Sequence, residues 1–368
     1  MEQRKKESGI RLEDVAAGYG RKSLLNHISL HVSPGNVLTL IGPNGAGKST
    51  ILKTVTRQLA ELGGTIFLEG TSMSPMVMTE RLHPEFMTCR EVVATGRYPY
   101  TGRLGILSAE DWKLVDDAMQ LVHARDTADR NFSQISDGQR QRVMLARAIC
   151  QEPRILILDE PTSYLDMRYK IDILSSIRRL AAERNMAVVM SLHELDLALK
   201  VSDVIACVEG DHIGKTGTPE EVFSGDYIQK LYGVDAECFD PRTGAVYLRG
   251  NKSRPKIFVI GGAGSGIPVY HALQRKNVPF AAGILMENDV EYQDACAAAS
   301  RVVSVKPFFP VTEEEIAEAR SWIKTCETCV CCAETFGPYN EANRALREYA
   351  KTLGKLIPAE VLHHLEGT

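Results

Sequence analysis

One ten-residue segment, residues 41–50, restricts the fold of this chain more than any other part of the sequence. It reads IGPNGAGKST and follows the apolar run NVLTL. Gly42, Gly47, Lys48 and Ser49 fit the G-x-x-x-x-G-K-[ST] spacing of a phosphate-binding loop. Because glycines lack the Cβ atom that would block close approach, successive backbone N–H groups can converge on phosphate oxygens. The segment predicts a nucleoside triphosphate site, and a plain glycine-rich turn is the alternative.

The residues around this loop predict how the triphosphate is held. Lys48 supplies a positive charge for the outer phosphates, and Ser49 supplies an oxygen for Mg²⁺. VLTLI is expected to be a buried strand, and STILKTVTRQLA the helix whose N-terminus faces the anion. Contacts to ATP are predicted along the whole loop: Gly42, Pro43, Asn44, Gly45, Ala46, Gly47, Lys48, Ser49 and Thr50.

A second apolar strand is expected in RILILDEP, residues 154–161, which ends in two acids. In an enzyme with a phosphate-binding loop, Asp159 is expected to hold Mg²⁺ through water or Ser49. Glu160 beside it could polarise the attacking water as a general base. Two acids that merely end a strand are the alternative.

A helix start is predicted in ISDGQRQRVMLARAIC. Ser136 and Gln139 have the S-x-x-Q spacing of a capping box, and an apolar helix face follows. A capped helix N-terminus preceded by serine and glycine is a candidate anion site, although most capping boxes only start helices. Unaided, His193 after the strand-like AVVMSL and Tyr19 near a turn are ordinary residues.

The order GPNGAGKST, ISDGQRQR, LILDEPTSYLD, SLHEL resembles the ATP-binding cassette of ABC transporters over residues 10–250. The resemblance implies an α/β, P-loop NTPase fold in residues 1–251. Its parts are a RecA-like core, an antiparallel β subdomain and a helical subdomain at about 81–152. In that family two cassettes face each other, and each ATP lies between one phosphate loop and the other copy's signature helix.

The resemblance also assigns roles to single residues. Glu160 and His193 are implied to be catalytic, with His193 as the switch histidine at the γ-phosphate. Asp166 matches the acid of the D-loop at the dimer seam, and Tyr19 the aromatic ring that stacks on adenine. The signature residues implied to close over the second copy's ATP are Ser136, Gly138 and Gln139.

Two departures from the family pattern carry expectations of their own. The signature, usually L-S-G-G-Q, has Asp137 at its third position, and we expect this carboxylate to point away from the triphosphate. Only TSMSPMVMT separates Gly70 from Glu80, too short for the usual helix, strand and glutamine loop. Glu80 stands where that glutamine would be, so a metal contact by Glu80 is an open expectation.

Composition and local resemblance predict the partners. A net charge of −4 without a long basic block gives no support for nucleic-acid binding. No apolar run approaches the ~18 residues of a spanning helix, and the start lacks the apolar core of a signal peptide. VVATGRYPY and the following SAED resemble importers of iron–siderophores, haem and cobalamin, whose helical subdomain receives a coupling helix from a separate permease.

These features predict an ATP-hydrolysing importer subunit on the cytoplasmic face of the membrane. Its predicted partners are a second cassette, transmembrane permease subunits and, indirectly, an extracytoplasmic substrate-binding protein. Tyr98 and Tyr100 are candidate permease contacts, with local packing as the alternative. In the alternative function, a non-transport ATPase, the cassette is a nucleotide switch for a ligand-sensing C-terminal domain.

Residues 252–368 start a new pattern. KIFVIGGAGSGIPVYHALQRK predicts strand, glycine turn and helix, and PFAAGIL, RVVSV and TCVCC predict further strands. The alternation indicates a small Rossmann-like α/β domain with a parallel sheet. GGAGSG fails the G-x-G-x-x-G spacing in both registers, so a tight turn is favoured. A small-anion site stays open, as does a dinucleotide site using Glu287 or Asp289.

Four cysteines crowd into CETCVCC: Cys326, Cys329, Cys331 and Cys332. Strand alternation would send Cys329 and Cys331 to one face of a sheet and Cys332 to the other. We interpret them as small buried thiols. A zinc or iron–sulfur site, or redox sensing, is the alternative.

Overall fold

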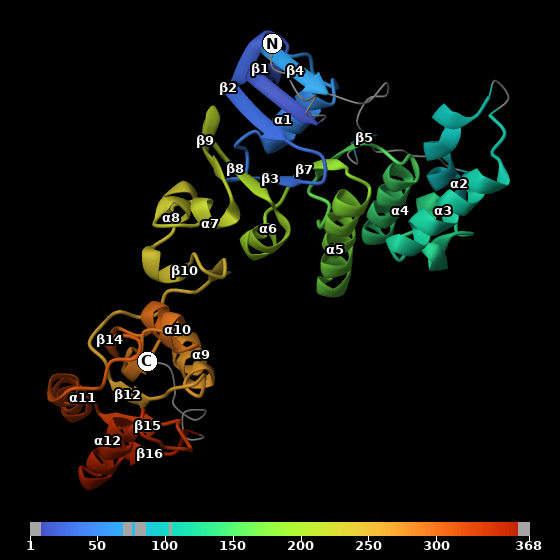
Figure 1. The fold of residues 1–368 in the computed structure, drawn as a ribbon. Coiled ribbons are helices and arrows are strands. Elements are labelled where there is room, and N and C mark those ends of the chain that lie inside the picture. The colour runs from blue at the N-terminus through green and yellow to red at the C-terminus, as the bar shows by residue number, and fades with distance from the viewer. Residues whose placement is uncertain (1–8, 69–75, 78–85, 103–104, 360–368) are drawn as a thin grey trace. The chain divides into compact units, whose positions relative to one another are not determined.

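The computed structural model describes residues 9–68, 76–77, 86–102 and 105–359. The chain divides into two compact units, Met1–Gly233 with Pro241–Gly244 and Val234–Asp240 with Ala245–Thr368. We call the first unit the cassette and the second the tail (Figure 1). The division at residue 252 that the sequence suggests stays a prediction.

The cassette is built on a six-stranded sheet with the order β5-β6-β7-β3-β8-β9. All neighbouring strands are parallel except β9, which runs antiparallel to β8. Every residue of β3 and β7 is buried, as in strands covered on both faces. In chain order the strands are β3 Val37–Ile41, β5 Met76–Val77, β6 Ile155–Asp159, β7 Ala187–Ser191, β8 Val204–Glu209 and β9 His212–Gly217.

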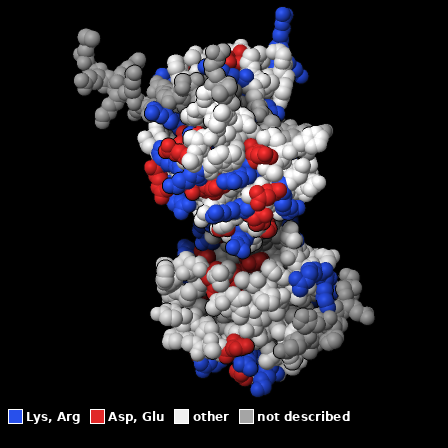
Figure 2. All heavy atoms as spheres, turned by 90° about the vertical axis from the view of Figure 1, so that its right-hand side faces the viewer, with Lys and Arg blue, Asp and Glu red and all other residues white. Residues whose placement is uncertain are grey.

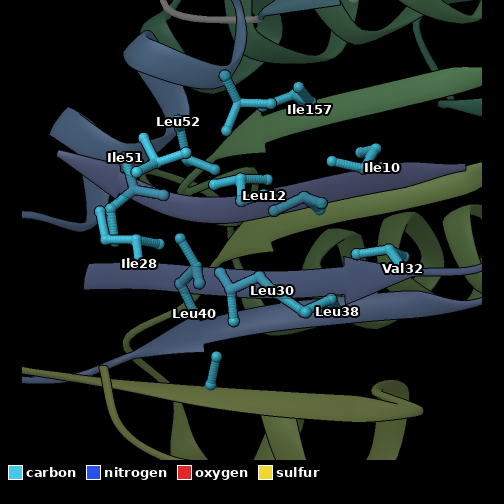
Figure 3. Close-up of a cluster of buried hydrophobic side chains, with 14 of the residues drawn as sticks. Ile10, Leu12, Ile28, Leu30, Val32, Leu38, Leu40, Ile51, Leu52 and Ile157 are labelled. Carbon is cyan, nitrogen blue, oxygen red and sulfur yellow. The ribbon is translucent and has the colours of Figure 1, made fainter. Parts of the chain in front are cut away.

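A second, antiparallel sheet of order β2-β1-β4 forms the β subdomain. Its strands are β1 Ile10–Tyr19, β2 Lys22–Val32 and β4 Gly63–Leu68. Helix α1 (Lys48–Val55) packs against it, and Figure 3 shows Ile10, Leu12, Leu30 and Ile51 directed into one shared apolar core. This core fixes the position of α1 and therefore of the loop that precedes it.

Helices cover the core sheet and form a helical subdomain. The subdomain contains α2 Cys89–Ala94, the 3-10 helices η1 Thr95–Tyr100, η2 Arg125–Thr127 and η3 Phe132–Gln134, and α3 Ala109–Leu121 and α4 Asp137–Cys150. The remaining cassette helices are α5 Met167–Glu183, α6 Leu195–Val201, α7 Pro219–Val222 and α8 Tyr227–Tyr232. No helix among the described residues is long and apolar enough to cross a bilayer.

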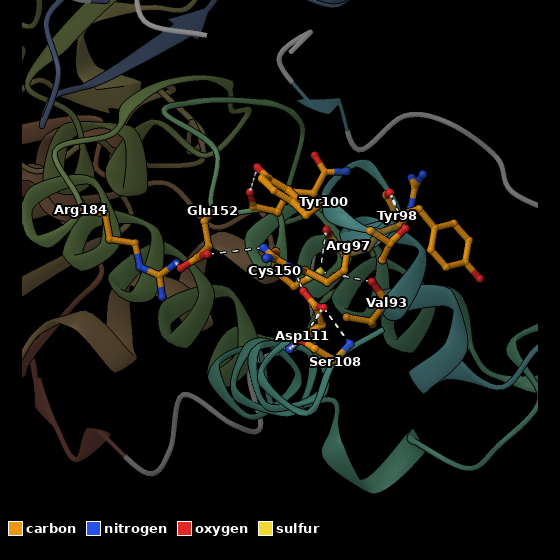
Figure 4. Close-up of polar contacts among 12 residues, drawn as sticks. Val93, Arg97, Tyr98, Tyr100, Ser108, Asp111, Cys150, Glu152 and Arg184 are labelled. Carbon is orange, nitrogen blue, oxygen red and sulfur yellow. Dashed lines mark hydrogen bonds and ion pairs between the residues drawn. The ribbon is translucent and has the colours of Figure 1, made fainter. Parts of the chain in front are cut away.

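One buried arginine ties the helical subdomain together (Figure 4). Arg97 donates from Nε to Asp111 Oδ1 at 2.9 Å and from Nη1 to the Cys150 carbonyl at 2.8 Å. Its guanidinium carbon lies 4.2 Å from the centre of the Tyr100 ring, and Nη1 is 3.4 Å from Glu152 Oε2. Arg97 thereby connects η1, the start of α3 and the end of α4.

The tail has a parallel five-stranded sheet of order β14-β13-β12-β15-β16. Buried apolar side chains form one cluster on each face, which confirms the predicted small parallel α/β fold. Its strands are β12 Ile257–Ile260, β13 Phe280–Met286, β14 Arg301–Val305, β15 Thr328–Cys331 and β16 Leu356–Ile357. Its helices are α9 Ile267–Arg275, α10 Tyr292–Ala298, α11 Glu313–Thr325 and α12 Glu341–Thr352, and a short segment holds η4 Ala236–Cys238 with the hairpin β10 Phe239–Asp240 and β11 Ala245–Val246.

Candidate nucleotide site

The phosphate loop connects β3 to α1 in a conformation that only glycine accepts easily. Gly42, Gly45 and Gly47 have φ values of 148°, 81° and 100°. A Cβ atom at Gly42 would lie 2.4 Å from the Val208 carbonyl oxygen, and one at Gly47 2.5 Å from Leu25. The bare backbone predicted from the sequence is therefore a steric requirement of this loop.

Lys48 lies across the loop that it follows. Its Nζ donates to the carbonyl oxygens of Gly42 at 2.6 Å and Pro43 at 3.1 Å. Burial lowers the pKa of Lys48, and the negative charges of Glu160 and Asp159 act against that shift. Helix α1 begins at Lys48 without a side-chain cap, so its first amides face the loop as donors for an anion.

Ser191 holds the two acids that end β6. Its hydroxyl donates to Asp159 Oδ1 at 2.6 Å and accepts from the Glu160 N–H at 2.9 Å. The contact follows from strand register, because Asp159 pairs with Ser191 between β6 and β7. Ser191 was not among the residues predicted from the sequence, since spacing along the chain does not show cross-strand neighbours.

The Glu160 carboxylate and the His193 ring meet directly. His193 Nε2 lies 2.6 Å from Glu160 Oε1, and Ser163 Oγ donates to Glu160 Oε2 at 3.0 Å. Gln141 of α4 donates to the Glu160 carbonyl at 2.9 Å. The two residues predicted to be catalytic therefore share one hydrogen-bonded cluster.

The structure describes two of the three predicted Mg²⁺ ligands, Ser49 and Asp159. A serine hydroxyl at Ser49 and a carboxylate at Asp159 form the oxygen donor set that Mg²⁺ prefers. Ser49 lies in α1 directly after the phosphate loop that follows β3, and Asp159 is the last residue of β6, a strand of the same sheet. Glu80, the third predicted ligand, lies outside the described residues, as does most of the shortened segment before it.

The signature helix begins as its capping box predicts. Ser136 Oγ accepts from the Gln139 N–H at 3.3 Å, and Gln139 Oε1 accepts from the Ser136 N–H at 3.1 Å. The Asp137 carboxylate pairs with Arg140 at 2.7 Å on the helix surface. A Cβ atom at Gly138 would lie 2.9 Å from the Tyr164 carbonyl oxygen, so glycine lets this turn approach the D-loop.

The remaining predicted contacts lie at the ends of elements. Asp166 is the N-cap of α5 and accepts from the Tyr169 N–H at 3.1 Å. Tyr19 ends β1 with half of its surface exposed, as a ring that stacks on a base must be. The structure contains a single copy of the chain, so the nucleotide contacts of Tyr19, Ser136, Gly138 and Asp166 stay predictions.

Comparison with known proteins decides the family. Residues 25–163 match the family described as ABC transporter. An ABC transporter ATP-binding protein of Methanocaldococcus jannaschii is 37% identical over 288 residues, which cover 75% of this chain and 99% of the relative. The chain belongs to the ABC transporter ATP-binding family. It is an ABC ATPase, and the family match includes the phosphate loop and the two acids that end β6.

Two further relatives of this ABC ATPase have names that state a cargo. The iron(3+)-hydroxamate import ATP-binding protein of Bacillus subtilis is 33% identical, over 64% of this chain and 92% of its own length. The cobalamin import ATP-binding protein of Halobacterium salinarum is 32% identical, over 80% of this chain and 78% of its own length. Residues 280–360 match the MJ0874 family.

A solved ATP-binding cassette of an ABC transporter has the same fold. The two structures share 23% identity with a TM-score of 0.53, over 61% of this chain and 98% of the other. This similarity shows the fold of the cassette.

In the glycine loop of the tail, two backbone N–H groups already donate to carboxylates of the tail itself. Asp289 Oδ2 accepts from the Ala263 N–H at 2.8 Å, and Glu291 Oε2 accepts from the Gly266 N–H at 2.8 Å. These are the donors that a bound phosphate would need. The arrangement favours the tight turn over the small-anion and dinucleotide alternatives.

The clustered cysteines of the tail lie on both faces of its sheet. Cys329 and Cys331 contact one apolar cluster and Cys332 the other, as strand alternation predicts. Burial raises the pKa of Cys332 to about 12 and that of Cys326 to about 11. Among the described residues, no three His, Cys, Asp or Glu side chains are grouped to hold a metal ion. These observations support the interpretation as buried structural thiols.

Proposed function

We propose that this ABC ATPase is the ATP-hydrolysing subunit of an importer that takes up an iron chelate or cobalamin. The observation that carries the hydrolytic part of the proposal is the Glu160–His193 pair, in which Glu160 Oε1 and His193 Nε2 lie 2.6 Å apart. A carboxylate held in place by hydrogen bonds in an enzyme with a phosphate-binding loop can accept a proton from the water that attacks the γ-phosphate. The cargo class is supported by the relatives named for iron(3+)-hydroxamate and cobalamin import.

The proposed reaction uses groups of one copy of the chain and two residues of a second copy. The loop amides and Lys48 bind the phosphates, and Ser49 with Asp159 would hold Mg²⁺, which supplies charge neutralisation. Glu160 accepts the proton of the attacking water, while His193 fixes the carboxylate in position. Ser136 and Gly138 of a second copy close the site, so that ATP is cleaved only in the dimer.

The helical subdomain supplies the surface for the permease. It exposes three large apolar side chains: Phe86 is 89% exposed, Ile106 73% and Tyr98, in η1, 50%. Tyr100 is half exposed as well, but its hydroxyl donates to the Gln151 carbonyl and its ring packs on Arg97, so local packing explains it. Tyr98 is the stronger candidate contact, and docking here places the protein on the cytoplasmic face of the membrane.

Surface charge fits a protein partner better than a nucleic acid. On the face drawn in Figure 2, acidic and basic side chains alternate over the cassette. Binding to a nucleic-acid backbone requires lysines and arginines gathered in one track. The expectation that nucleic acid is not a partner stays a prediction.

Uptake by living cells tests the proposed function. In a strain of the source organism that lacks this gene, uptake of ⁵⁵Fe-labelled ferric hydroxamate or of ⁵⁷Co-labelled cobalamin should fall to background. The native gene should restore it, and a Lys48→Ala gene expressed at the same level should not. If neither uptake changes while the purified chain hydrolyses ATP, the proposed import of a ferric hydroxamate or cobalamin is wrong.

A further inference from the structure

A tyrosine from the end of the cassette holds the first residue of the phosphate loop. The Gly42 N–H donates to the hydroxyl oxygen of Tyr232 at 2.8 Å, a contact between residues 190 positions apart. Burial raises the pKa of Tyr232 to about 12, so the hydroxyl stays neutral at physiological pH. Strand β8 also approaches Gly42 closely, because a Cβ atom there would lie 2.4 Å from the Val208 carbonyl oxygen. The start of the loop is therefore held between β8 and Tyr232.

Tyr232 is also the last residue of α8 before the chain enters the tail. Helix α8 ends at Gly233 in a left-handed conformation, and the tail begins at Val234. One residue, Gly233, therefore separates the start of the tail from the tyrosine that contacts Gly42. Sequence spacing gave no signal for Tyr232, because only the folded chain brings α8 to the loop.

Where the chain re-enters the cassette, it lies against helix α6. Residues Pro241–Gly244 belong to the cassette, between two segments of the tail. Gly244 has a φ of 72°, and a Cβ atom there would lie 2.8 Å from the Asp196 backbone. Asp196 is in the first turn of α6, whose N-cap is Glu194, directly after His193.

We infer that Tyr232 and Gly244 are positioning residues through which the tail controls ATP binding and hydrolysis. The chain passes between cassette and tail three times, and these contacts lie beside those passages. One contact sets the phosphate loop, and the other sets the helix that follows His193. The inference deepens the proposed function, since it names the part of the chain that regulates the same site.

Removal of one hydroxyl tests the first contact. In the full-length Tyr232→Phe variant, the Gly42 N–H loses its acceptor, and the loop spends part of its time in conformations that do not bind nucleotide. We expect the dissociation constant for ADP, by isothermal titration calorimetry, and the KM for ATP each to rise about tenfold, with kcat within twofold of native. Tyr227→Phe is the matched control, because its hydroxyl lies in the same helix but donates to Glu209.

A single methyl group tests the second contact. Gly244→Ala places a Cβ atom against Asp196 and should displace the start of α6, so that kcat falls about tenfold while KM changes less than twofold. Gly225→Ala is the matched control, because Gly225 has a φ of 73° but no neighbouring atom within 4 Å of a Cβ. Equal effects of the two variants would show that backbone strain alone is responsible.

The effect of bound nucleotide on the tail tests whether the tail regulates the nucleotide site. If the tail acts on the nucleotide site, nucleotide must act on the tail to the same extent. We expect ADP to slow amide hydrogen exchange in residues 234–240 and 245–250 at least threefold in the native protein, and this effect to disappear in Tyr232→Phe at saturating ADP. Unchanged exchange in the native protein, or native ADP affinity in Tyr232→Phe, overturns the inference and leaves the ATPase role intact. Failure of the native chain to bind ADP would instead defeat the proposed function.

Discussion

At the scale of one residue, the backbone and side chain of Glu160, the predicted general base, are held by several contacts. It has a φ of 49°, an unusual conformation for a side chain of this kind, and its N–H, carbonyl and carboxylate are all hydrogen-bonded. Such a conformation costs free energy and persists where neighbouring contacts enforce it. Here the enforcement comes from Ser191, Gln141 and His193.

Glu160→Gln tests whether this carboxylate is the general base. The amide keeps the shape of the side chain but cannot accept the proton, so kcat should fall at least ~100-fold while ATP still binds. Phosphate release and the dissociation constant for ATP measure the two quantities separately. Glu209→Gln, a surface change, is the control, and hydrolysis by Glu160→Gln at the native rate would exclude the role.

Residue types at fixed spacing were predictable from the sequence, and contacts across the fold were not. Lys48 and Glu160 stand in local motifs whose chemistry follows from neighbours along the chain. Ser191 and Tyr232 reach the site only through strand register and through the return of α8 to the loop. Neither Ser191 nor Tyr232 belongs to a sequence motif that would predict its contact.

At the scale of elements, burial and capping explain which predictions were accurate. The apolar runs of β3 and β6 form strands, and Ser136 starts α4 where the capping box predicts. Helix α10 and strand β16 of the tail were not predicted. They have seven and two residues, too few for a periodic pattern to stand out.

The buried carboxylate of Glu291 predicts how the stability of the tail depends on pH. Glu291 is fully buried and accepts from the Tyr270 hydroxyl at 2.7 Å and from the Gly266 N–H. Burial raises the pKa of Glu291 above its ordinary value of 4.5. The folded tail therefore binds this proton more tightly than the unfolded tail. Its contribution to stability is complete below pH ~4.5 and is lost as the pH rises through the raised pKa.

Urea unfolding of the full chain measures this effect. With Trp112 replaced by Phe, the fluorescence of Trp322 in α11 reports the tail alone. The unfolding midpoint should fall between pH 4.5 and 7, and Glu291→Gln should reduce that fall, because glutamine does not titrate. Glu314→Gln, on the exposed side of α11, should leave the fall unchanged. An identical pH dependence in Glu291→Gln would contradict the assignment.

At the scale of the whole molecule, the cassette holds only part of the predicted site. Lys48, Asp159, Glu160 and His193 come from one copy. In the proposed function, the signature residues of a second copy close over the same ATP. Hydrolysis then depends on association, and this dependence is what lets ATP move a permease.

The mass of the Glu160→Gln protein in solution tests this dependence most directly. Light scattering coupled to size-exclusion chromatography should give the mass of two chains with saturating ATP and Mg²⁺, and of one chain with ADP. Adding Lys48→Ala to this protein should return it to one chain, because the loop then loses its phosphate ligand. The mass of a single chain at saturating ATP, with ATP shown to be bound, would contradict the account.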